Sequence, residues 1–297
     1  MLDVRRLQLL CDLSRLGTIA AVAQAHTYTP SAVSQQLSAL ERETGVRLLE
    51  RTGRRVTFTS AGVVLVEHAE GVLAALERTT AALASLSSGV SGQLRIGAFP
   101  TAVRTLLPAA LVDLGKRHPG LELRVSEVDP MAVPAALRER RLDVGLLHDY
   151  DVVPVEPDPL LDGVPLLDET VFLAVPGTSV VDVDPLAEVR DAAWIMASPG
   201  TWCHAVTVQV CRAAGFTPRV RHHADDFATV LALVAAEQGV SLVPELAVVQ
   251  VPVGVRLIPL PTRRRTRVAY RQGADSHPAV AAFVAAVRDS AGAFTGR

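Results

Sequence analysis

Three helix signals follow one another at the N-terminus, separated by turns too short to hold other structure. Apolar residues recur at helical spacing over 3–16, and Gly17 ends that helix. A second helix begins at Thr18 and consists largely of alanine, whose small side chain lets a neighbouring helix cross closely. A third begins at Thr29 and Pro30, where an N-cap residue precedes proline at the first helical position. Short helices joined by tight turns form either a plain helical bundle or a helix-turn-helix.

The third helix, SAVSQQLSALERE, has an apolar face and a short polar face that is almost uncharged. Val33, Leu37 and Leu40 recur at i, i+4 and i+7 and predict the buried face. Ordinary surface helices carry Lys, Glu and Arg on the opposite face, but this one carries Ser and Gln. Hydroxyls suit phosphate contacts, and glutamine can pair bidentately with adenine in a major groove. The candidates for DNA contact at this helix are Thr29, Pro30, Ser31, Ser34, Gln35 and Ser38.

A hairpin of two short strands is predicted after the third helix. Gly53 provides its turn, and a strand follows over 56–59. Arg54 and Arg55 stand at the tip, and arginine is the residue that enters narrow minor grooves. Residues 1–60 contain eight arginines and five acids, whereas the whole chain has a net charge of −2. Contact with nucleic acid is therefore expected at this end of the molecule.

The run GTIAAVAQAHTYTPSAVSQQLSALERETGVRLLERTGRRVTFTSAG resembles, without a gap, the winged helix-turn-helix of the LysR-type transcriptional regulators. The family usually has Leu where His26 stands, Phe where Leu49 stands, and often Arg where Gln35 stands. His26 is therefore expected to reduce local packing slightly, and Gln35 leaves the operator preference open. The resemblance implies groove-facing positions at Pro30, Ser31, Ser34 and Gln35, and a wing at Arg54 and Arg55.

A long helix is predicted from Ser60 to Leu86, with only Gly62 and Gly71 disfavouring it. Seven of its residues are spaced alternately four and three apart, the a/d pattern of a coiled coil. The alternative is a helix packed on its own domain. LysR-type regulators dimerise through a linker helix at this place, so the resemblance favours pairing, which demands a dyad-symmetric site. The predicted dimerisation seam is Leu65, Ala69, Val72, Leu76, Thr79, Leu83 and Leu86.

The remaining residues alternate short apolar runs with amphipathic helices. Strands at 94–98, 121–125 and 143–147 enclose helices at 102–118 and 131–142. This βαβαβ order predicts a parallel sheet with right-handed crossovers. A second set has strands at 170–175, 194–197, 220–224, 240–243, 255–260 and 267–271, and helices at 202–214, 226–237 and 278–290.

The predicted fold class is an N-terminal all-α winged helix-turn-helix with a long linker helix, followed by an α/β effector domain of two lobes. The two lobes resemble the periplasmic-binding-protein-like effector domain of the same family. The expected boundaries are 1–60 for the DNA-binding domain, 61–87 for the linker helix, 88–92 for a hinge, 93–163 with 266–297 for lobe one, and 164–265 for lobe two.

A small effector is expected in the crevice between the lobes, at the carboxyl ends of the strands. Two predicted helix N-termini there, after strands 94–98 and 194–197, favour an anionic ligand such as a small carboxylate. The alternative is that Thr101 and Ser198 merely cap their helices. The candidate effector residues are Phe99, Pro100, Thr101, Leu147, His148, Ser198, Pro199, Gly200, Thr201, Trp202, Phe227, Val243 and Pro244.

Two cysteines and an arginine run offer other interpretations. Cys203 and Cys211 lie where peroxide-sensing members of the family carry a reactive pair, although the spacing differs by one residue, so a redox-sensing regulator is an alternative. Cys211 falls on the apolar stripe of its helix, where cysteine simply packs. The run from Arg263 to Arg267 is expected between the lobes, solvated or paired with acids.

Catalytic motifs such as GxSxG, HExxH or a glycine-rich phosphate loop are missing from the sequence, which predicts a protein that is not an enzyme and needs no cofactor or metal. The sequence also lacks a signal peptide and a membrane-spanning run, which predicts a cytoplasmic protein. A solute-binding module without DNA function is a further alternative. The expected partners are a double-stranded DNA operator, a small-molecule effector, a second copy as a homodimer or homotetramer, and RNA polymerase.

Overall fold

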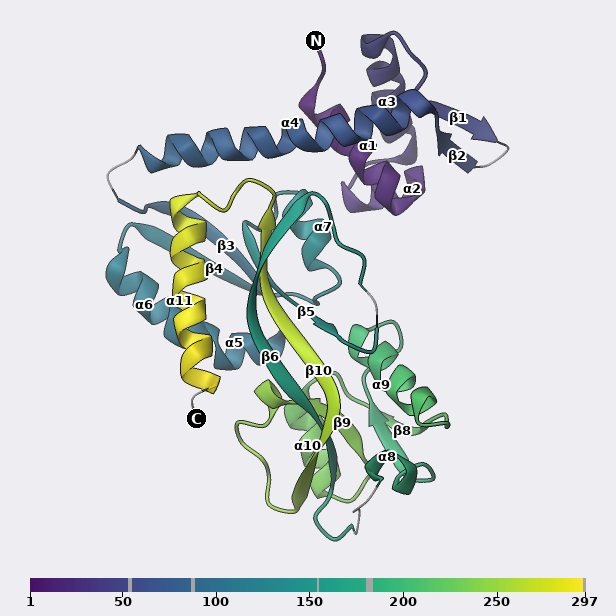
Figure 1. Ribbon diagram of the computed structural model, residues 1–297, viewed down its shortest axis with the longest axis vertical. Coiled ribbons are helices and arrows are strands. Elements are labelled where there is room, and N and C mark those ends of the chain that lie inside the picture. Colours follow the sequence, from purple (N-terminus) through teal and green to yellow (C-terminus); the bar gives the residue numbers. More distant parts are fainter. Residues whose placement is uncertain (53–54, 87–88, 154, 180–183, 296–297) are drawn as a thin grey trace.

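The computed structural model describes residues 1–52, 55–86, 89–153, 155–179 and 184–295. A small helical unit lies at one end, a long helix extends from it, and a two-lobed α/β unit lies beneath both (Figure 1). Among the described residues, no helix combines the length and the apolar character that crossing a membrane would require.

The N-terminal unit contains three short helices and a two-stranded hairpin, as the sequence predicts. Asp3, Thr18 and Thr29 each accept backbone N–H groups at the start of a helix, which fixes where the three helices begin. Glu41 accepts the N–H groups of Leu48 and Leu49 at 2.9 and 3.1 Å, which ties the hairpin to the third helix. The elements are α1 (Val4–Leu16), α2 (Ile19–Ala25), α3 (Pro30–Thr44), β1 (Leu49–Thr52) and β2 (Arg55–Phe58).

Helix α4 (Ser60–Ser85) belongs to the N-terminal unit at one end and crosses over the α/β unit at the other (Figure 1). Leu65 and Ala69 pack into the core of the N-terminal unit, against α1. Glu77 is nearly buried, and its Oε1 lies 3.1 Å from Nε of Arg271 in the α/β unit. Ser87, the last residue of the predicted linker helix, and Ser88, the first of the predicted hinge, lie outside the described residues.

A six-stranded mixed sheet organises the α/β unit, in the order β4-β3-β5-β10-β6-β9. Strands β3, β4 and β5 are parallel, as the βαβαβ pattern predicts, whereas β10 runs antiparallel to both β5 and β6. A separate parallel pair, β7 and β8, lies in the far lobe. The strands are β3 (Gly92–Ala98), β4 (Leu121–Glu127), β5 (Val144–Tyr150), β6 (Leu161–Pro176), β7 (Ala193–Met196), β8 (Arg219–His223), β9 (Ser241–Pro244) and β10 (Val255–Arg271).

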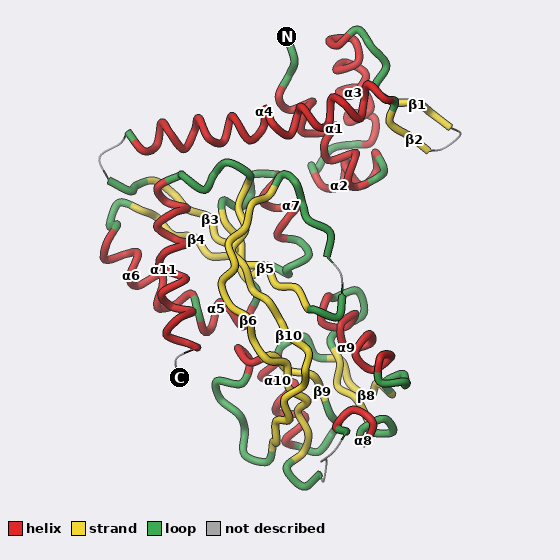
Figure 2. Tube along the Cα trace, in the orientation of Figure 1, coloured by secondary structure: helices red, strands yellow, loops and turns green. Residues whose placement is uncertain are grey.

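Strands β6 and β10 run through both lobes as long partners, which corrects the sequence prediction (Figure 2). The sequence predicts a short strand at 170–175 and two separate strands at 255–260 and 267–271. Pro259 and Pro261 and the arginine run obscure the pattern, and the ladder accommodates them by a register shift between Pro259 and Arg263. The expected lobe boundaries at 164 and 265 therefore fall inside two continuous strands.

Helices cover the sheet on both lobes. The predicted single helix at 102–118 is two helices, because Pro108 starts a new one after Leu106. The predicted helix at 131–142 is shorter, since it spans only 133–138. Lobe one packs α6 and α11 together against the sheet around Phe283, which is fully buried. The helices are α5 (Pro100–Thr105), α6 (Leu107–Arg117), α7 (Val133–Arg138), α8 (Pro185–Glu188), α9 (Trp202–Ala213), α10 (Phe227–Ala235), η1 (Glu245–Ala247) and α11 (Pro278–Thr295).

A chain of charged side chains joins the N-terminal unit to lobe one. His26 lies 2.7 Å from Asp12, whose other oxygen lies 3.0 Å from Nε of Arg138 at the end of α7. Arg138 also donates to Asp158 at 2.6 Å, and Asp158 pairs with Arg15 of α1. Burial pushes the pKa of Asp12 upward, but hydrogen bonds from His26 and Gln8 and the charge of Arg138 outweigh it and lower that pKa below its ordinary value.

Removal of Arg138 tests this ionic chain. Arg138→Met keeps the aliphatic stem but leaves the buried Asp12 and its neighbour Asp158 short of a cation, so we expect a loss of about 3 kcal/mol in the free energy of unfolding, measured by urea denaturation. Arg124→Met is the matched control, because Arg124 is 61% exposed in its pair with Glu122 and should lose less than about 0.5 kcal/mol. Equal small losses in the two variants would contradict this account.

Candidate functional site

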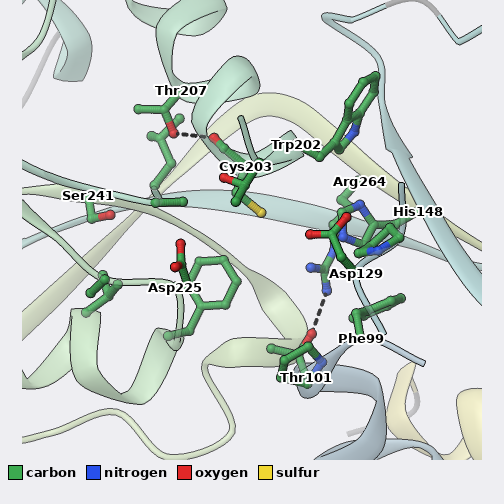
Figure 3. Close-up of a pocket in the computed structure, with 18 of the residues that line it drawn as sticks. Phe99, Thr101, Asp129, His148, Trp202, Cys203, Thr207, Asp225, Ser241 and Arg264 are labelled. Atoms are coloured by element: carbon green, nitrogen blue, oxygen red, sulfur yellow. Dashed lines mark hydrogen bonds between the residues drawn. The ribbon is translucent and has the colours of Figure 1, made fainter. Parts of the chain in front are cut away.

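A cleft of about 300 Å³ lies between the lobes. It is bounded by the chain after β3, by β5, by the start of α9 and by the middle of β10 (Figure 3). This is the crevice at the carboxyl ends of the parallel strands, where ligands of open α/β sheets bind. Its size is at the lower end of the range for small-molecule sites, roughly 300–1,000 Å³.

The structure brings part of the predicted effector set together. Seven of the predicted residues line the cleft: Phe99, Pro100, Thr101, His148, Thr201, Trp202 and Phe227. Six others do not, namely Leu147, Ser198, Pro199, Gly200, Val243 and Pro244.

Strand alternation explains several of these errors. Leu147 packs on α7 on the opposite face of β5 from His148, and Val243 packs with α10, while its neighbour Leu242 lines the cleft. Because successive side chains point to opposite faces, an error of one residue exchanges the cleft for the core. The loop residues from Ser198 to Gly200 lie just outside the cleft, at the start of α9.

Arg264 is the most buried charge in the cleft and is not among the residues predicted from the sequence. Its side chain is 1% exposed and pairs with Glu169, its direct cross-strand partner on β6. Its Nη2 donates to Oγ1 of Thr101 at 3.5 Å, and its guanidinium lies 5.1 Å from the centre of the Phe99 ring. Burial works against the Arg264 charge, but the Glu169 carboxylate outweighs it and holds the arginine pKa above its ordinary value. The expectation that the arginine run pairs with acids is confirmed here, and period-two alternation was the signal for an inward residue.

His148 and Tyr150 stack edge-on behind Phe99. The ring of His148 lies 4.7 Å from that of Phe99 and 5.4 Å from that of Tyr150. Burial, followed by the nearby charge of Arg264, lowers the pKa of His148 well below its ordinary value, so the imidazole is neutral at physiological pH. Burial also raises the pKa of Tyr150 well above its ordinary range, so its hydroxyl stays protonated.

Cys203 lies in the cleft wall, whereas Cys211 does not. The Sγ of Cys203 lies 3.9 Å from the hydroxyl of Tyr150. Burial raises the pKa of the Cys203 thiol, despite the opposing effect of Arg264. Cys211 is fully buried in the core of lobe two, and burial raises the pKa of its thiol to about 12.

Three carboxylates that were not predicted from the sequence also line the cleft. Glu127 ends β4, Asp129 follows it, and Asp225 follows β8. The backbone N–H and hydroxyl of Ser198 donate to Asp225 at 2.7 and 2.8 Å, and the N–H of Met131 donates to Asp129 at 2.8 Å. The position of these residues directly after strands was the available signal, since strand ends of both lobes meet at the crevice.

The polar face of α3 is open to solvent. Thr29, Pro30, Ser31, Gln35 and Ser38 are exposed, and Ser34 is half-buried. Thr29 caps the helix by accepting the N–H of Ala32 at 3.2 Å, and its hydroxyl lies 2.9 Å from that of Ser31. Gly53 and Arg54 of the predicted wing lie outside the described residues, as does the side chain of Arg55.

His26 makes a polar contact that the sequence did not predict. The residue ends α2, and instead of only reducing packing its imidazole pairs with the buried Asp12 of α1. The polar partner compensates for the apolar contact that leucine would make. His26 therefore links the turn between α2 and α3 to the ionic chain that reaches lobe one.

The predicted seam on α4 divides into two parts. Leu65 and Ala69 face the N-terminal core, as described above. The later seam residues are open in the single chain: Val72, Leu76, Thr79, Leu83 and Leu86 are all exposed.

Two family descriptions match the chain. Residues 4–63 match "Bacterial regulatory helix-turn-helix protein, lysR family", and residues 87–292 match "LysR substrate binding domain". The first contains α3 and its polar face, and the second contains every residue that lines the cleft.

Curated relatives extend along most of the chain. A "Probable hydrogen peroxide-inducible genes activator" of Mycobacterium avium is 33% identical over 236 residues, which cover 77% of this chain and 73% of the relative. A "Hydrogen peroxide-inducible genes activator" of Dickeya chrysanthemi is 30% identical and covers 92% of this chain and 90% of the relative. The "Probable HTH-type transcriptional regulator LrrA" of Synechococcus elongatus is 28% identical and covers 98% of each.

Solved structures share the fold at lower identity. A mutant of OxyR from Corynebacterium glutamicum has a TM-score of 0.61 and 24% identity, covering 100% of this chain and 93% of the other. Full-length CbnR in complex with its target DNA has a TM-score of 0.54 and 22% identity, covering 97% of this chain and 100% of the other. With both family descriptions matched along most of its length, the chain belongs to the LysR family of transcriptional regulators and combines a helix-turn-helix DNA-binding domain with an effector-binding domain.

Proposed function

We propose that two copies of the chain pair through α4 and bind a dyad-symmetric operator, with α3 of each copy in a major groove. The observation that carries this proposal is the exposed polar face of α3, which presents hydroxyls and Gln35 without a charged side chain. Pairing doubles the base contacts that one helix-turn-helix can make. An electrophoretic retardation assay on DNA upstream of the protein's own gene tests it, and the affinity must fall as salt rises.

The cleft between the lobes is the proposed site of a small effector whose binding adjusts operator binding. Support comes from its enclosure by aromatic side chains with a few polar groups, the usual composition of ligand sites. RNA polymerase is a further proposed partner, on the family resemblance alone. Both a dimer and a dimer of dimers are compatible with pairing through α4.

A second candidate function is a response to peroxide through Cys203. It is favoured by the names of the curated relatives and by the position of the Cys203 thiol in the cleft wall. Two features weigh against it. Burial raises the pKa of Cys203, and only the thiolate reacts readily. Cys211 lies eight residues further along α9, about 12 Å of helix, so a disulfide between them requires that α9 unwind.

Gln35→Ala tests the base-reading role of α3. We expect a loss of about 1–3 kcal/mol on the preferred operator, because a bidentate contact to one base is removed, and no loss on operators altered at that base pair. Competition binding across single-base operator variants measures it. Ser14→Ala, on α1, serves as a control that should leave base preference unchanged. An equal loss on every operator would show that Gln35 does not read a base.

Leu83→Glu tests pairing through α4. Leu83 is 64% exposed in the single chain, and burying it in a dimer contributes about 1.5–3 kcal/mol per copy. We therefore expect the dimer dissociation constant to rise at least about tenfold, measured by sedimentation equilibrium. Ser85→Glu introduces the same charge off the seam and should leave the constant unchanged. Unchanged assembly of the Leu83 variant would place the interface elsewhere.

Alkylation of Cys203 tests the second candidate function. Because the thiol pKa is raised, the thiolate fraction at pH 7 is below that of a free cysteine, and labelling by iodoacetamide should be slower than for glutathione and should accelerate as pH rises. Mass spectrometry of intact wild type and Cys203→Ser protein assigns the site. Rapid oxidation by peroxide at pH 7, together with an altered operator affinity that Cys203→Ser abolishes, would establish the redox function instead.

A further inference from the structure

The cleft carries more negative than positive charge. Among the described residues that line it, Glu127, Asp129 and Asp225 are acids, and Arg264 is the sole lysine or arginine. The Arg264 charge is already compensated, since Glu169 pairs with it at full burial. An incoming ligand therefore meets carboxylates with no spare cation beside them.

The three carboxylates lack counter-ions in the part of the chain that the structure describes. None of the ion pairs there involves Glu127, Asp129 or Asp225. The partners of Asp225 are the neutral groups of Ser198, and that of Asp129 is a backbone N–H. Figure 3 shows Asp129 and Asp225 on either side of the space that Cys203 faces. Their charges are thus held in place by neutral donors and remain available to a ligand.

Two cleft residues, His148 and Trp202, each have a buried ring nitrogen without a hydrogen-bond partner among the described residues. His148 is 8% exposed, lines the cleft, and its Nδ1 has no hydrogen-bond partner among the described residues. Buried polar atoms are nearly always paired, so an unpaired nitrogen on a residue of the cleft wall is a candidate partner for a ligand. The imidazole is neutral, since its pKa is lowered by burial and by Arg264, and a neutral imidazole can accept an N–H from a ligand.

Aromatic rings complete a surface suited to a positive charge. Phe99, Trp202 and Phe227 all line the cleft, and Phe99 already lies against a guanidinium, that of Arg264. Ring faces attract ammonium and guanidinium groups, most strongly where water is excluded. The same rings offer an apolar surface to the rest of the ligand.

We propose that the effector of this cleft is an organic cation, an amine or guanidine with a short apolar part, whose charged end lies between Asp129 and Asp225. This rests on the proposed function, in which the cleft is the effector site. It replaces the small carboxylate expected from the sequence, since a carboxylate would bring a fourth unpaired negative charge into the cleft.

Matched pairs of small molecules test the sign of the ligand's charge. The full-length protein is titrated in a calorimeter with butylammonium and butyrate, and with benzylammonium and benzoate, which differ chiefly in charge. The ammonium member of at least one pair should bind at least about tenfold more tightly than its carboxylate partner, and should raise the melting temperature, because it binds only the folded state.

Asp129→Asn and Asp225→Asn locate the charge that is recognised. Asparagine keeps the Oδ1 that accepts the N–H of Met131 or Ser198, so the loops retain their hydrogen bonds while the charge is lost. Each variant should weaken binding of the ammonium ligand about tenfold or more. The control is Asp113→Asn, which removes an equal charge from the exposed face of α6 and should not alter binding.

The proposal would be overturned if the carboxylate members bound more tightly or if neither ammonium bound. It would also be overturned if ammonium binding were unchanged in both cleft variants. Failure of the regulator function looks different. It would be seen as a loss of salt-dependent operator retardation, which these titrations do not involve, so the two proposals fail separately.

Discussion

The pairing of β6 with β10 is the constraint on which the effector unit depends. These strands pass through both lobes, and their register sets Arg264 directly opposite Glu169 at the level of the cleft. A charge this deeply buried persists only with a partner, and a slip of one residue would turn both side chains to the other face. The free oxygen of Glu169 also accepts the N–H of Leu246 at 2.7 Å, which fixes η1 beside the same strands. One cross-strand pair therefore fixes the back wall of the cleft, and Thr101 and Phe99 are positioned against it.

Helix α7 lies between a loop of the cleft wall and the DNA-binding unit. The loop that carries Asp129 leads directly into α7, and Arg138 at its other end reaches Asp12 of α1. Asp12 in turn holds His26, next to the turn that precedes α3. The helix is only six residues long, and its side chains Val133, Ala136 and Leu137 are buried. In the proposal above, a ligand at Asp129 would bind beside one end of the segment whose other end, at Arg138, pairs with the helix-turn-helix unit.

Local sequence patterns predicted most helices and strands. The features that were not predicted depend on contacts between residues distant in the sequence. Thr29, Pro30 and Gly45 mark the ends of α3 within the sequence itself, and the cap geometry matches. The sequence predicts two strands in place of β10, because Pro259, Pro261 and the arginines are not typical of a strand. The partner strand β6 nevertheless accommodates them. The pairing of His26 with Asp12 joins different helices, and that of Asp12 with Arg138 joins different domains, so neither could be inferred from spacing. Leu147 and Val243 were near the cleft but on the wrong face, because the register of a strand depends on its neighbours.

The sequence predicts an anionic ligand, whereas the structure leads to the proposal of a cationic one, and the difference has a physical reason. The sequence predicts an anionic ligand from two helix N-termini, each equivalent to about half a positive charge at the end of the helix. In the structure α5 has only six residues, and the hydroxyl of Thr201 already accepts the N–H of His204 at the start of α9. Both features weaken the attraction of the helix N-termini for an anion. Against them stand the carboxylates of Asp129 and Asp225, which are exposed residues in the lining of the same cleft. Whole charges outweigh partial ones, so in the proposal above the carboxylates, and not the helix ends, set the sign of the ligand's charge.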